Sequence, residues 1–388
     1  MKQKNIKPGK AFGIRVGDFV EDSIEKSIVN GKEAPVLSGE PEEKIWYRVP
    51  VAAGITGDGS DYHIYIKKAP SDNLCVFLSG GGVAWNEYTA ARPVTGGKVA
   101  AGLPNYYWNS LRPFTQIMNI NTGITETGNP RNPFDDWNFI IITYATGDFH
   151  VGCSDFPYEA EDGSRQILHF HGYENFREGM ETGRKYFGSP QKLLIAGDSA
   201  GAFAVPALAD EILTDFYPEC RDVTLLSDSG QLLYDRWRAT AREVWKAKEP
   251  VWKAIQGPNI TLEWYRALYQ KRGDQLKYLY ASSVRDYLLS AYYNDVAHRM
   301  YKTDAEVQEI FFGQLQEMVW GLKRLTPHFG IFLNDWKNFF LMRGGTVHTA
   351  VRKRQFYHRT RAGISMAGWL RDAVNGCIRD VGLALLED

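Results

Sequence analysis

Hydrophobic and polar positions divide the chain into short apolar runs and longer segments with helical spacing. Short runs rich in apolar, β-branched and aromatic residues are typical of strands, and a run without strict alternation indicates a strand buried on both faces of a parallel sheet. Such runs occupy residues 45–51, 62–68, 74–80, 137–145, 192–197, 223–230, 329–333 and 337–342. We expect a strand at each of them.

Helical patterns surround the run at 192–197. Residues 164–187 have helical spacing before it, and residues 200–213 have it directly afterwards. The succession of strand, crossover helix and strand predicts an α/β fold with a mostly parallel central sheet flanked by helices. A last helix is expected near residues 366–376.

The remaining segments suggest a single domain over residues 1–388 with two additions, an N-terminal arm and a helical insertion. Residues 1–40 are polar and contain several Gly and Pro, so we expect an irregular N-terminal arm. Residues 81–136 form a Gly/Asn/Pro/Tyr-rich stretch of weak periodicity, and loops of that length are usually functional. Residues 233–325 are almost wholly helical in pattern and rich in Trp and Tyr, which predicts a helical insertion or cap, or further helical core.

A candidate nucleophile lies between the run at 192–197 and the helix that follows. The motif Gly197-Asp198-Ser199-Ala200-Gly201 is the only G-x-S-x-G in the chain. A serine on a tight strand-to-helix turn is the nucleophile elbow of many esterases, and the helix N-terminus favours a developing oxyanion. The ordinary alternative is a serine that only caps a helix. The strand-turn-helix context favours the nucleophile.

Three consecutive glycines, the first of which ends the run at 74–80, predict an oxyanion hole. A tetrahedral acyl intermediate needs preorganised N–H donors, and a glycine-rich turn lets the backbone approach it closely. We expect the amides of Gly81 and Gly82 there, together with that of Ala200. A flexible turn is the alternative, and no phosphate-binding glycine motif is present.

The general base is expected at His348. In folds with a nucleophile elbow the acid and then the histidine follow the serine in the chain. Four of the eight histidines follow Ser199, namely His298, His328, His348 and His358. His348 alone lies in a glycine-containing loop just after a predicted late strand, where such a base belongs.

Two carboxylates are candidates for the acid. Asp335 follows the run at 329–333 and precedes His348 by 13 positions, whereas Asp295 precedes it by 53. Spacing slightly favours Asp335 or leaves the choice open.

Four segments together resemble the pectin acetylesterase/Notum family, in order over roughly residues 45–360. They are LSGGGVAWN, WNFIIITYATGDFHVG, IAGDSAGAFA and YNDVAH. The resemblance implies an α/β-hydrolase-like fold and ester hydrolysis by a Ser-Asp-His triad, without metal or other cofactor. Carried over, the nucleophile is Ser199, the base His348 and the acid Asp295, in preference to Asp335.

The resemblance also implies a substrate and its contacts. We expect hydrolysis of O-acyl esters, foremost O-acetyl, on a carbohydrate or small molecule, with Trp85, Asp148 and His150 binding substrate. Val83 and Ala84 replace the family's Trp-Cys, which alters the wall beside the glycines. A lipid or acyl-protein carboxylesterase is the alternative within enzymes, and a catalytically inactive binding scaffold is the alternative outside them.

A second group of polar residues could suggest a metal site. His150, Cys153, Asp155, His169 and His171 crowd a short span. The last two lie in the helical pattern of 164–187, and no ligand spacing is diagnostic. We therefore expect no metal there.

Charge and cysteine content exclude several classes. Lys and Arg total 45 and Asp and Glu 46, a balance that argues against a nucleic-acid binder and makes the basic segment 352–361 a solvated face. No run approaches the ~18 apolar residues of a membrane span. Four widely spaced cysteines and a start without an apolar leader core predict reduced thiols in a cytoplasmic protein, or a secreted one if a leader had been removed. The oligomeric state stays open.

Overall fold

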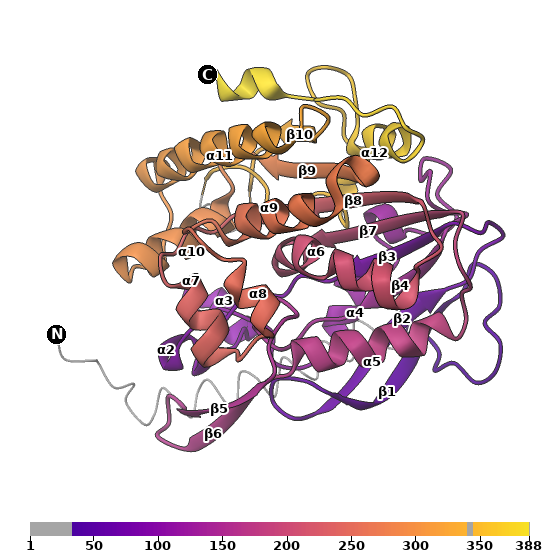
Figure 1. Ribbon diagram of the computed structural model, residues 1–388. Coiled ribbons are helices and arrows are strands. Elements are labelled where there is room, and N and C mark those ends of the chain that lie inside the picture. The colour runs from indigo at the N-terminus through magenta and orange to yellow at the C-terminus, as the bar shows by residue number, and fades with distance from the viewer. Residues whose placement is uncertain (1–32, 340–343, 388) are drawn as a thin grey trace.

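A mixed sheet forms the centre of the protein (Figure 1). The computed structural model describes residues 33–339 and 344–387. Within them, eight strands are arranged in the order β1-β2-β4-β3-β7-β8-β9-β10. Their bounds are β1 (Trp46–Ile55), β2 (Asp61–Lys67), β3 (Leu74–Leu78), β4 (Asn138–Ile142), β7 (Lys192–Asp198), β8 (Asp222–Asp228), β9 (Lys277–Ser283) and β10 (Gly330–Asn334). Strands β1 and β2 are antiparallel to their neighbours, and the other six are parallel.

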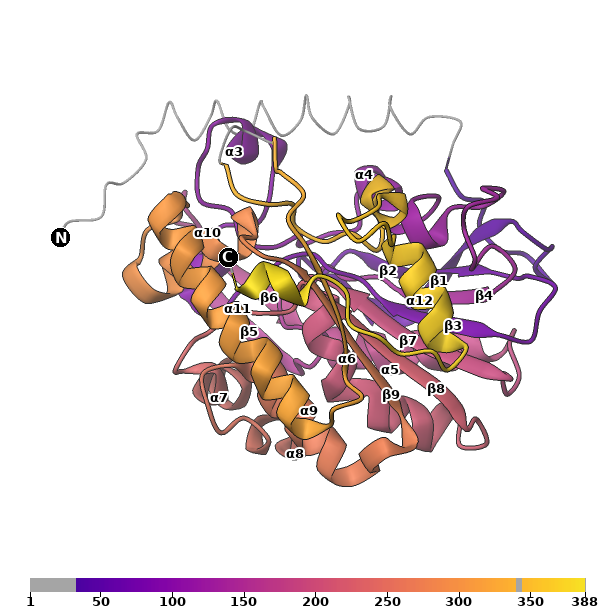
Figure 2. The same ribbon diagram turned by 90° about the horizontal axis from the view of Figure 1, so that it is seen from above.

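Helices cover both faces of this sheet. The α-helices within the described residues are α2 (Glu87–Ala90), α3 (Gly96–Ala100), α4 (Pro113–Asn119), α5 (Gly172–Arg184), α6 (Ala200–Glu211), α7 (Trp237–Ala239), α8 (Glu249–Lys253), α9 (Ile260–Arg272), α10 (Tyr287–His298), α11 (Ala305–Leu325) and α12 (Met366–Val374). Helices α5, α6 and α9 lie on one side of the sheet and α12 lies on the other (Figure 2).

The core consists of two apolar layers separated by the sheet. Along β3, Val76 and Leu78 join the layer that contains α5, α6 and α9, whereas Cys75 and Phe77 join the layer against α12. A strand with both faces buried must be apolar at every position. This explains why the central strands are continuous apolar runs in the sequence.

Most of the predicted elements are confirmed. Seven of the eight predicted strands correspond to β1, β2, β3, β4, β7, β8 and β10, and the helices after residue 200 and near residue 366 are α6 and α12. In the run predicted at 337–342, residues 340–342 lie outside the described residues and 337–339 contain no strand. Of the predicted N-terminal arm, residues 1–32 lie outside the described residues, and 33–40 are irregular.

Two segments differ from the prediction. The segment 233–325 is not wholly helical, because residues 277–283 form β9 within the central sheet. The segment 164–187 is not one helix, because its first part forms β6 (Arg165–Phe170), which pairs with β5 (Ser154–Glu159) in a separate hairpin before α5 begins. In both places the chain alternates or mixes polar and aromatic residues, so its pattern fits a strand and a helix equally.

The six parallel strands place their carboxyl ends at one edge of the sheet. The predicted glycine turn follows β3, Ser199 follows β7, and β8, β9 and β10 end beside them. This edge is where open α/β sheets bind ligands.

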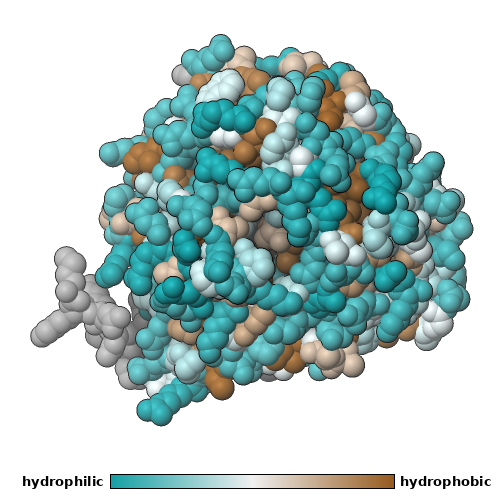
Figure 3. Space-filling model, viewed as in Figure 1, coloured by the Kyte–Doolittle hydropathy of each residue, from teal (hydrophilic) through white to brown (hydrophobic). Residues whose placement is uncertain are grey.

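Hydrophilic residues predominate on the face of the molecule drawn in Figure 3, with apolar residues scattered among them. None of the helices in the described ranges is long and apolar enough to cross a membrane.

Candidate active site

Ser199 lies on the turn between β7 and α6, as the motif predicts. Its backbone has φ 51° and ψ −125°, a conformation that costs a residue with a Cβ about 1–3 kcal/mol and that concentrates at functional sites. The Ser199 amide donates to the Asp228 carbonyl at 2.9 Å, and its carbonyl accepts from the Ala202 amide at 2.9 Å. The neighbouring strand and the first turn of the helix therefore hold the strained residue from both sides.

Two glycines of the motif are required by close backbone contacts. A Cβ added to Gly197 would lie 2.3 Å from the Gly201 carbonyl oxygen, and one added to Gly201 would lie 1.9 Å from the Leu78 carbonyl oxygen. No real Cβ comes so near a backbone oxygen. The turn can thus be this tight, and α6 can lie against β3, only without side chains at these positions.

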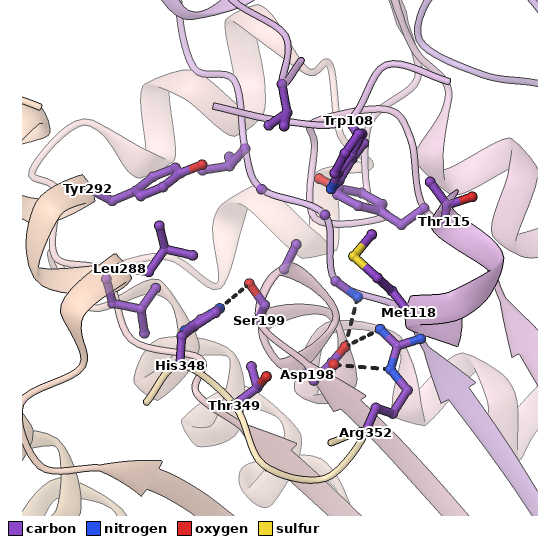
Figure 4. Close-up of a pocket in the computed structure, with 18 of the residues that line it drawn as sticks. Trp108, Thr115, Met118, Asp198, Ser199, Leu288, Tyr292, His348, Thr349 and Arg352 are labelled. Atoms are coloured by element: carbon purple, nitrogen blue, oxygen red, sulfur yellow. Dashed lines mark hydrogen bonds and ion pairs between the residues drawn. The ribbon is translucent and has the colours of Figure 1, made fainter. Parts of the chain in front are cut away.

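The imidazole of His348 is hydrogen-bonded to Ser199, as Figure 4 shows, and its other nitrogen meets a carboxylate. His348 Nε2 is 2.8 Å from Ser199 Oγ, and His348 Nδ1 is 2.7 Å from Asp286 Oδ2. His348 is 7% exposed and Asp286 is fully buried. With the Nδ1 proton directed at Asp286, the lone pair of Nε2 faces the serine hydroxyl, which is the arrangement of a serine triad.

The acid expected from the resemblance is therefore wrong in position. Asp295 lies within α10, where its Oδ2 accepts a hydrogen bond of 2.9 Å from the Tyr106 hydroxyl. The other candidate, Asp335, pairs with Arg361 at 2.6 Å. The residue that meets the histidine is Asp286, which neither spacing nor resemblance had selected.

Asp286 is held by the helix that it starts. It is the N-cap of α10, and its Oδ1 accepts from the amides of Leu288 at 2.9 Å and Leu289 at 3.0 Å. Aspartate is among the preferred N-cap residues because its carboxylate satisfies amides that the first turn leaves unpaired. One oxygen of the carboxylate is thus fixed by the helix and the other is directed at His348.

The loop that carries His348 is attached to the same region. Thr346 donates its amide to the Arg285 carbonyl at 2.8 Å, and its carbonyl accepts from the Tyr287 amide at 3.1 Å. The Val347 carbonyl accepts from the Ser283 hydroxyl at 2.5 Å. These bonds on either side of Asp286 fix the distance between the acid and the base.

Asp228, at the end of β8, fixes the other side of the histidine loop. Its Oδ2 accepts from the amides of Ala350 at 2.7 Å and Val351 at 2.8 Å. Burial raises the pKa of this carboxyl to about 6. The neighbouring Ser229 also holds the histidine loop, because its hydroxyl accepts from the Thr349 amide at 3.2 Å.

A buried ion pair lies beneath the serine. Asp198 receives two hydrogen bonds from Arg352, at 2.7 and 3.0 Å, and a third from the Gly80 amide at 2.9 Å. Arg352 also donates to Ser79 Oγ at 3.1 Å and to Asn119 Oδ1 at 2.6 Å. The pair thereby links the elbow, the glycine turn, the end of α4 and the histidine loop.

The predicted oxyanion donors lie at the expected turn. Gly80 uses its amide for Asp198, whereas the amides of Gly81 and Gly82 have no hydrogen-bond partner among the described residues. Gly82 has φ +83°, and a Cβ there would lie 1.9 Å from the Tyr106 carbonyl oxygen. Ala200 is the first residue of α6, so its amide has no acceptor within the helix. All three amides are available to a ligand beside Ser199.

A cavity of about 720 Å³ opens over Ser199 and His348. Its wall is largely apolar and comes mainly from the 81–136 segment, from α6 and from the start of α10; its apolar and aromatic residues include Val83, Val94, Val99, Trp108, Ile117, Met118, Phe149, Phe203, Leu232, Leu288, Leu289, Tyr292 and Tyr301. Figure 4 shows Trp108, Thr115 and Met118 on one side of Ser199 and Leu288 and Tyr292 on the other.

None of the three predicted substrate-binding residues lines this cavity. Trp85 packs edge-on against Tyr106 at 5.3 Å between ring centroids. Asp148 is fully buried and accepts from the Gly172 amide at 2.8 Å and from the His150 amide at 3.1 Å. His150 Nε2 is 2.9 Å from the Ser79 carbonyl oxygen, and burial lowers its pKa to about 4. In the structure these residues hold the loops behind the cavity, and their role in substrate binding stays a prediction.

Comparisons with known proteins identify the family and the fold. A profile of the family described as Pectinacetylesterase matches residues 51–254. Two crystal forms of the Wnt deacylase Notum from Drosophila are similar in structure, each with a TM-score of 0.57. One is 16% identical and covers 87% of this chain and 95% of its own; the other is 17% identical and covers 84% and 92%. No curated protein sequence matches.

Proposed function

Because this chain belongs to the pectinacetylesterase family, whose members hydrolyse carboxylic esters, we propose that it cleaves O-acyl esters with Ser199 as the nucleophile. The observation that carries the proposal is the hydrogen-bonded series from Ser199 Oγ through His348 to Asp286 at 2.8 and 2.7 Å. A serine that merely capped α6 would need neither the histidine nor the strained backbone.

In the proposed reaction His348 Nε2 takes the Ser199 proton as Oγ attacks the ester carbonyl. Asp286 accepts the Nδ1 hydrogen bond and stabilises the imidazolium. The amides of Gly81, Gly82 and Ala200 donate to the oxyanion. His348 then gives its proton to the leaving alcohol, and water, activated by the same imidazole, hydrolyses the acyl-serine.

The test is labelling by a fluorophosphonate, which reacts only with an activated serine. The wild-type protein should be labelled at Ser199 and should hydrolyse p-nitrophenyl acetate. Ser199→Ala should lose both properties while its thermal unfolding stays close to that of the wild type. A variant that kept full hydrolysis would reject the assignment.

The family's name favours a small acyl group, and an O-acetyl ester of a carbohydrate is the first candidate substrate. The cavity favours a second candidate. Its volume of about 720 Å³ lies in the range of sites for drug-sized ligands and far exceeds an acetyl group. Its apolar wall suits a longer acyl chain, as in a deacylase, because each buried methylene contributes roughly 0.8 kcal/mol.

Chain length distinguishes the two candidates. Values of kcat/KM for p-nitrophenyl esters from acetate to octanoate should fall if the natural acyl group is acetyl. They should rise over this series if the apolar wall receives the acyl chain. Trp108→Ala offers a check, because removal of a wall residue should alter the octanoate value much more than the acetate value.

The cytoplasmic location remains a prediction from sequence.

A further inference from the structure

Three side chains away from the triad come together where the β5–β6 hairpin meets α5. Asp155 lies on β5, His169 on β6, and His171 is the N-cap of α5. Asp155 and His169 are direct cross-strand partners. His171 follows His169 by two residues, the spacing that returns a side chain to the same face of an extended chain. The hairpin lies at the margin of the molecule (Figure 1).

Both imidazoles turn a nitrogen toward one carboxylate oxygen. Asp155 Oδ1 is 2.6 Å from His169 Nδ1 and 3.0 Å from His171 Nε2. The three potential ligand atoms all lie within 4.8 Å of one another. The two rings are nearly perpendicular, at 82°, with 5.6 Å between centroids. Two imidazole nitrogens and a carboxylate oxygen are a donor set that suits divalent transition metals, foremost zinc.

An ion requires a modest rearrangement of these side chains. Tetrahedral zinc with bonds of 2.0–2.1 Å separates its ligand atoms by roughly 3.3 Å, so the carboxylate must move outward by less than about 1 Å, and the two imidazole nitrogens, which lie within 4.8 Å of each other, must come to the same separation. The Asp155 side chain is 59% exposed and can make that movement. The histidines are better held: the His169 amide donates to the Gly57 carbonyl at 3.0 Å, and the His171 carbonyl accepts from the Asn175 amide at 2.9 Å.

We propose that Asp155, His169 and His171 bind one divalent transition-metal ion, zinc in preference, with the fourth position left to water. The ion would join β5, β6 and the start of α5. It takes no part in the ester chemistry. The expectation of no metal rested on the lack of a diagnostic ligand spacing and on assigning residues 169–171 to a helix. The structure removes the second reason, because β6 puts His169 opposite Asp155.

Titration of metal-free protein with Zn²⁺ by calorimetry tests the proposal. One ion should bind per chain and raise the Tm. His169→Ala and His171→Ala should each weaken binding at least about tenfold, since even outer partners of metal ligands are worth 10–100-fold. Asp155→Asn keeps the shape of an exposed side chain and should also weaken it. His328→Ala removes an exposed histidine elsewhere and should change nothing.

Two further measurements separate this site from other zinc-binding groups. Cys377 is an exposed free thiol, so Cys377→Ser should retain the bound ion. Co²⁺ in the site should give the visible spectrum of nitrogen and oxygen ligands without a thiolate charge-transfer band. Absence of stoichiometric Zn²⁺ binding, or binding that survives in both histidine variants, would leave only a hydrogen-bonded cluster and overturn the proposal. Hydrolysis of p-nitrophenyl acetate should be equal in all these variants, which keeps this test independent of the proposed esterase function.

Discussion

Asp286 performs two tasks at the scale of a single residue. One carboxylate oxygen accepts two amides at the start of α10, and the other meets His348 Nδ1. Because asparagine is also a good N-cap, Asp286→Asn separates the tasks: the helix cap is kept, whereas the negative charge beside the imidazole is lost.

We predict that Asp286→Asn lowers kcat by ~10⁴-fold, the effect of this exchange in serine proteases, because the amide favours the wrong imidazole tautomer. The matched control is Asp295→Asn, which should keep most of the activity, since Asp295 contacts Tyr106 and not the histidine. Steady-state kinetics with p-nitrophenyl acetate measures both. The reverse outcome would restore the acid that the family resemblance implies.

His150 is a second residue with a measurable signature. Burial lowers its pKa to about 4 from 6.5, so between these values the unfolded chain binds a proton that the folded protein does not. Linkage then requires the free energy of unfolding to rise with pH from about 4 to 6.5, by roughly 3 kcal/mol from this group. Below pH 4 His150 is protonated in both the folded and the unfolded state, so its contribution no longer changes with pH.

His150→Gln isolates this contribution. Asp148 and Asp228, whose pKa values burial raises to about 6, act with the opposite sign over much of the same range. They remain in both proteins, so they cancel in the difference between the wild type and the variant. Urea unfolding at a series of pH values should show that the free energy of unfolding of the wild type rises relative to that of the variant up to pH 6.5. A difference independent of pH would mean that His150 is not held neutral.

At the scale of elements, the tight packing of α6 against β3 depends on Gly201. We predict that Gly201→Ala destabilises the protein by more than about 3 kcal/mol, because the added Cβ would meet the Leu78 carbonyl oxygen at 1.9 Å. The control is Gly313→Ala within α11, where nothing lies within 4 Å and alanine should stabilise the helix by ~0.5–1 kcal/mol. Thermal and urea unfolding would compare the two. Equal effects would contradict the steric explanation.

At the centre of the sheet, β3, β4 and β7 could be predicted from the sequence. Strands β3 and β4 are apolar throughout because both faces are covered, and β7 is identified also by the motif that ends it. Strand β9 was missed because KYLYASS mixes tyrosines and serines within a segment of helical pattern. The failure to predict β9 explains why the wrong acid was selected. Without β9, nothing in the sequence marks Asp286 as a residue just beyond the carboxyl end of a strand.

Ser199 and His348 were predictable for a different reason. Each lies beside a strand or in a glycine-containing turn that local sequence reveals. The cavity wall was not predictable in the same way, because its residues come from loops and helices far apart in the chain. The predicted contacts Trp85, Asp148 and His150 are near these loops in sequence, but the folded chain turns them inward.

At the scale of the whole molecule, the Asp198–Arg352 pair joins segments that are distant in sequence. We predict that Arg352→Met costs about 3–5 kcal/mol of stability and lowers kcat, since it leaves a buried carboxylate without its partner next to the nucleophile. Asp198→Asn should be costly too, but the double variant should be less destabilised than the two single effects added together. Unfolding and kinetic measurements on the wild type, the two single variants and the double variant complete this double-mutant cycle. Simple additivity would indicate that the pair does not act as a unit.

Under the proposed mechanism, helix α10 would connect the size of the acyl group to the rate of the reaction. Its first turn supplies Leu288 and Leu289 to the cavity wall, and the amides of the same two residues hold the carboxylate of Asp286. If an oversized acyl group displaced this turn, the same movement would draw the carboxylate away from the imidazole. An oversized ester can then bind well and still react slowly. Selectivity against it would be expressed in kcat more than in KM, so a screen for binding alone would pass substrates and inhibitors that the enzyme does not turn over.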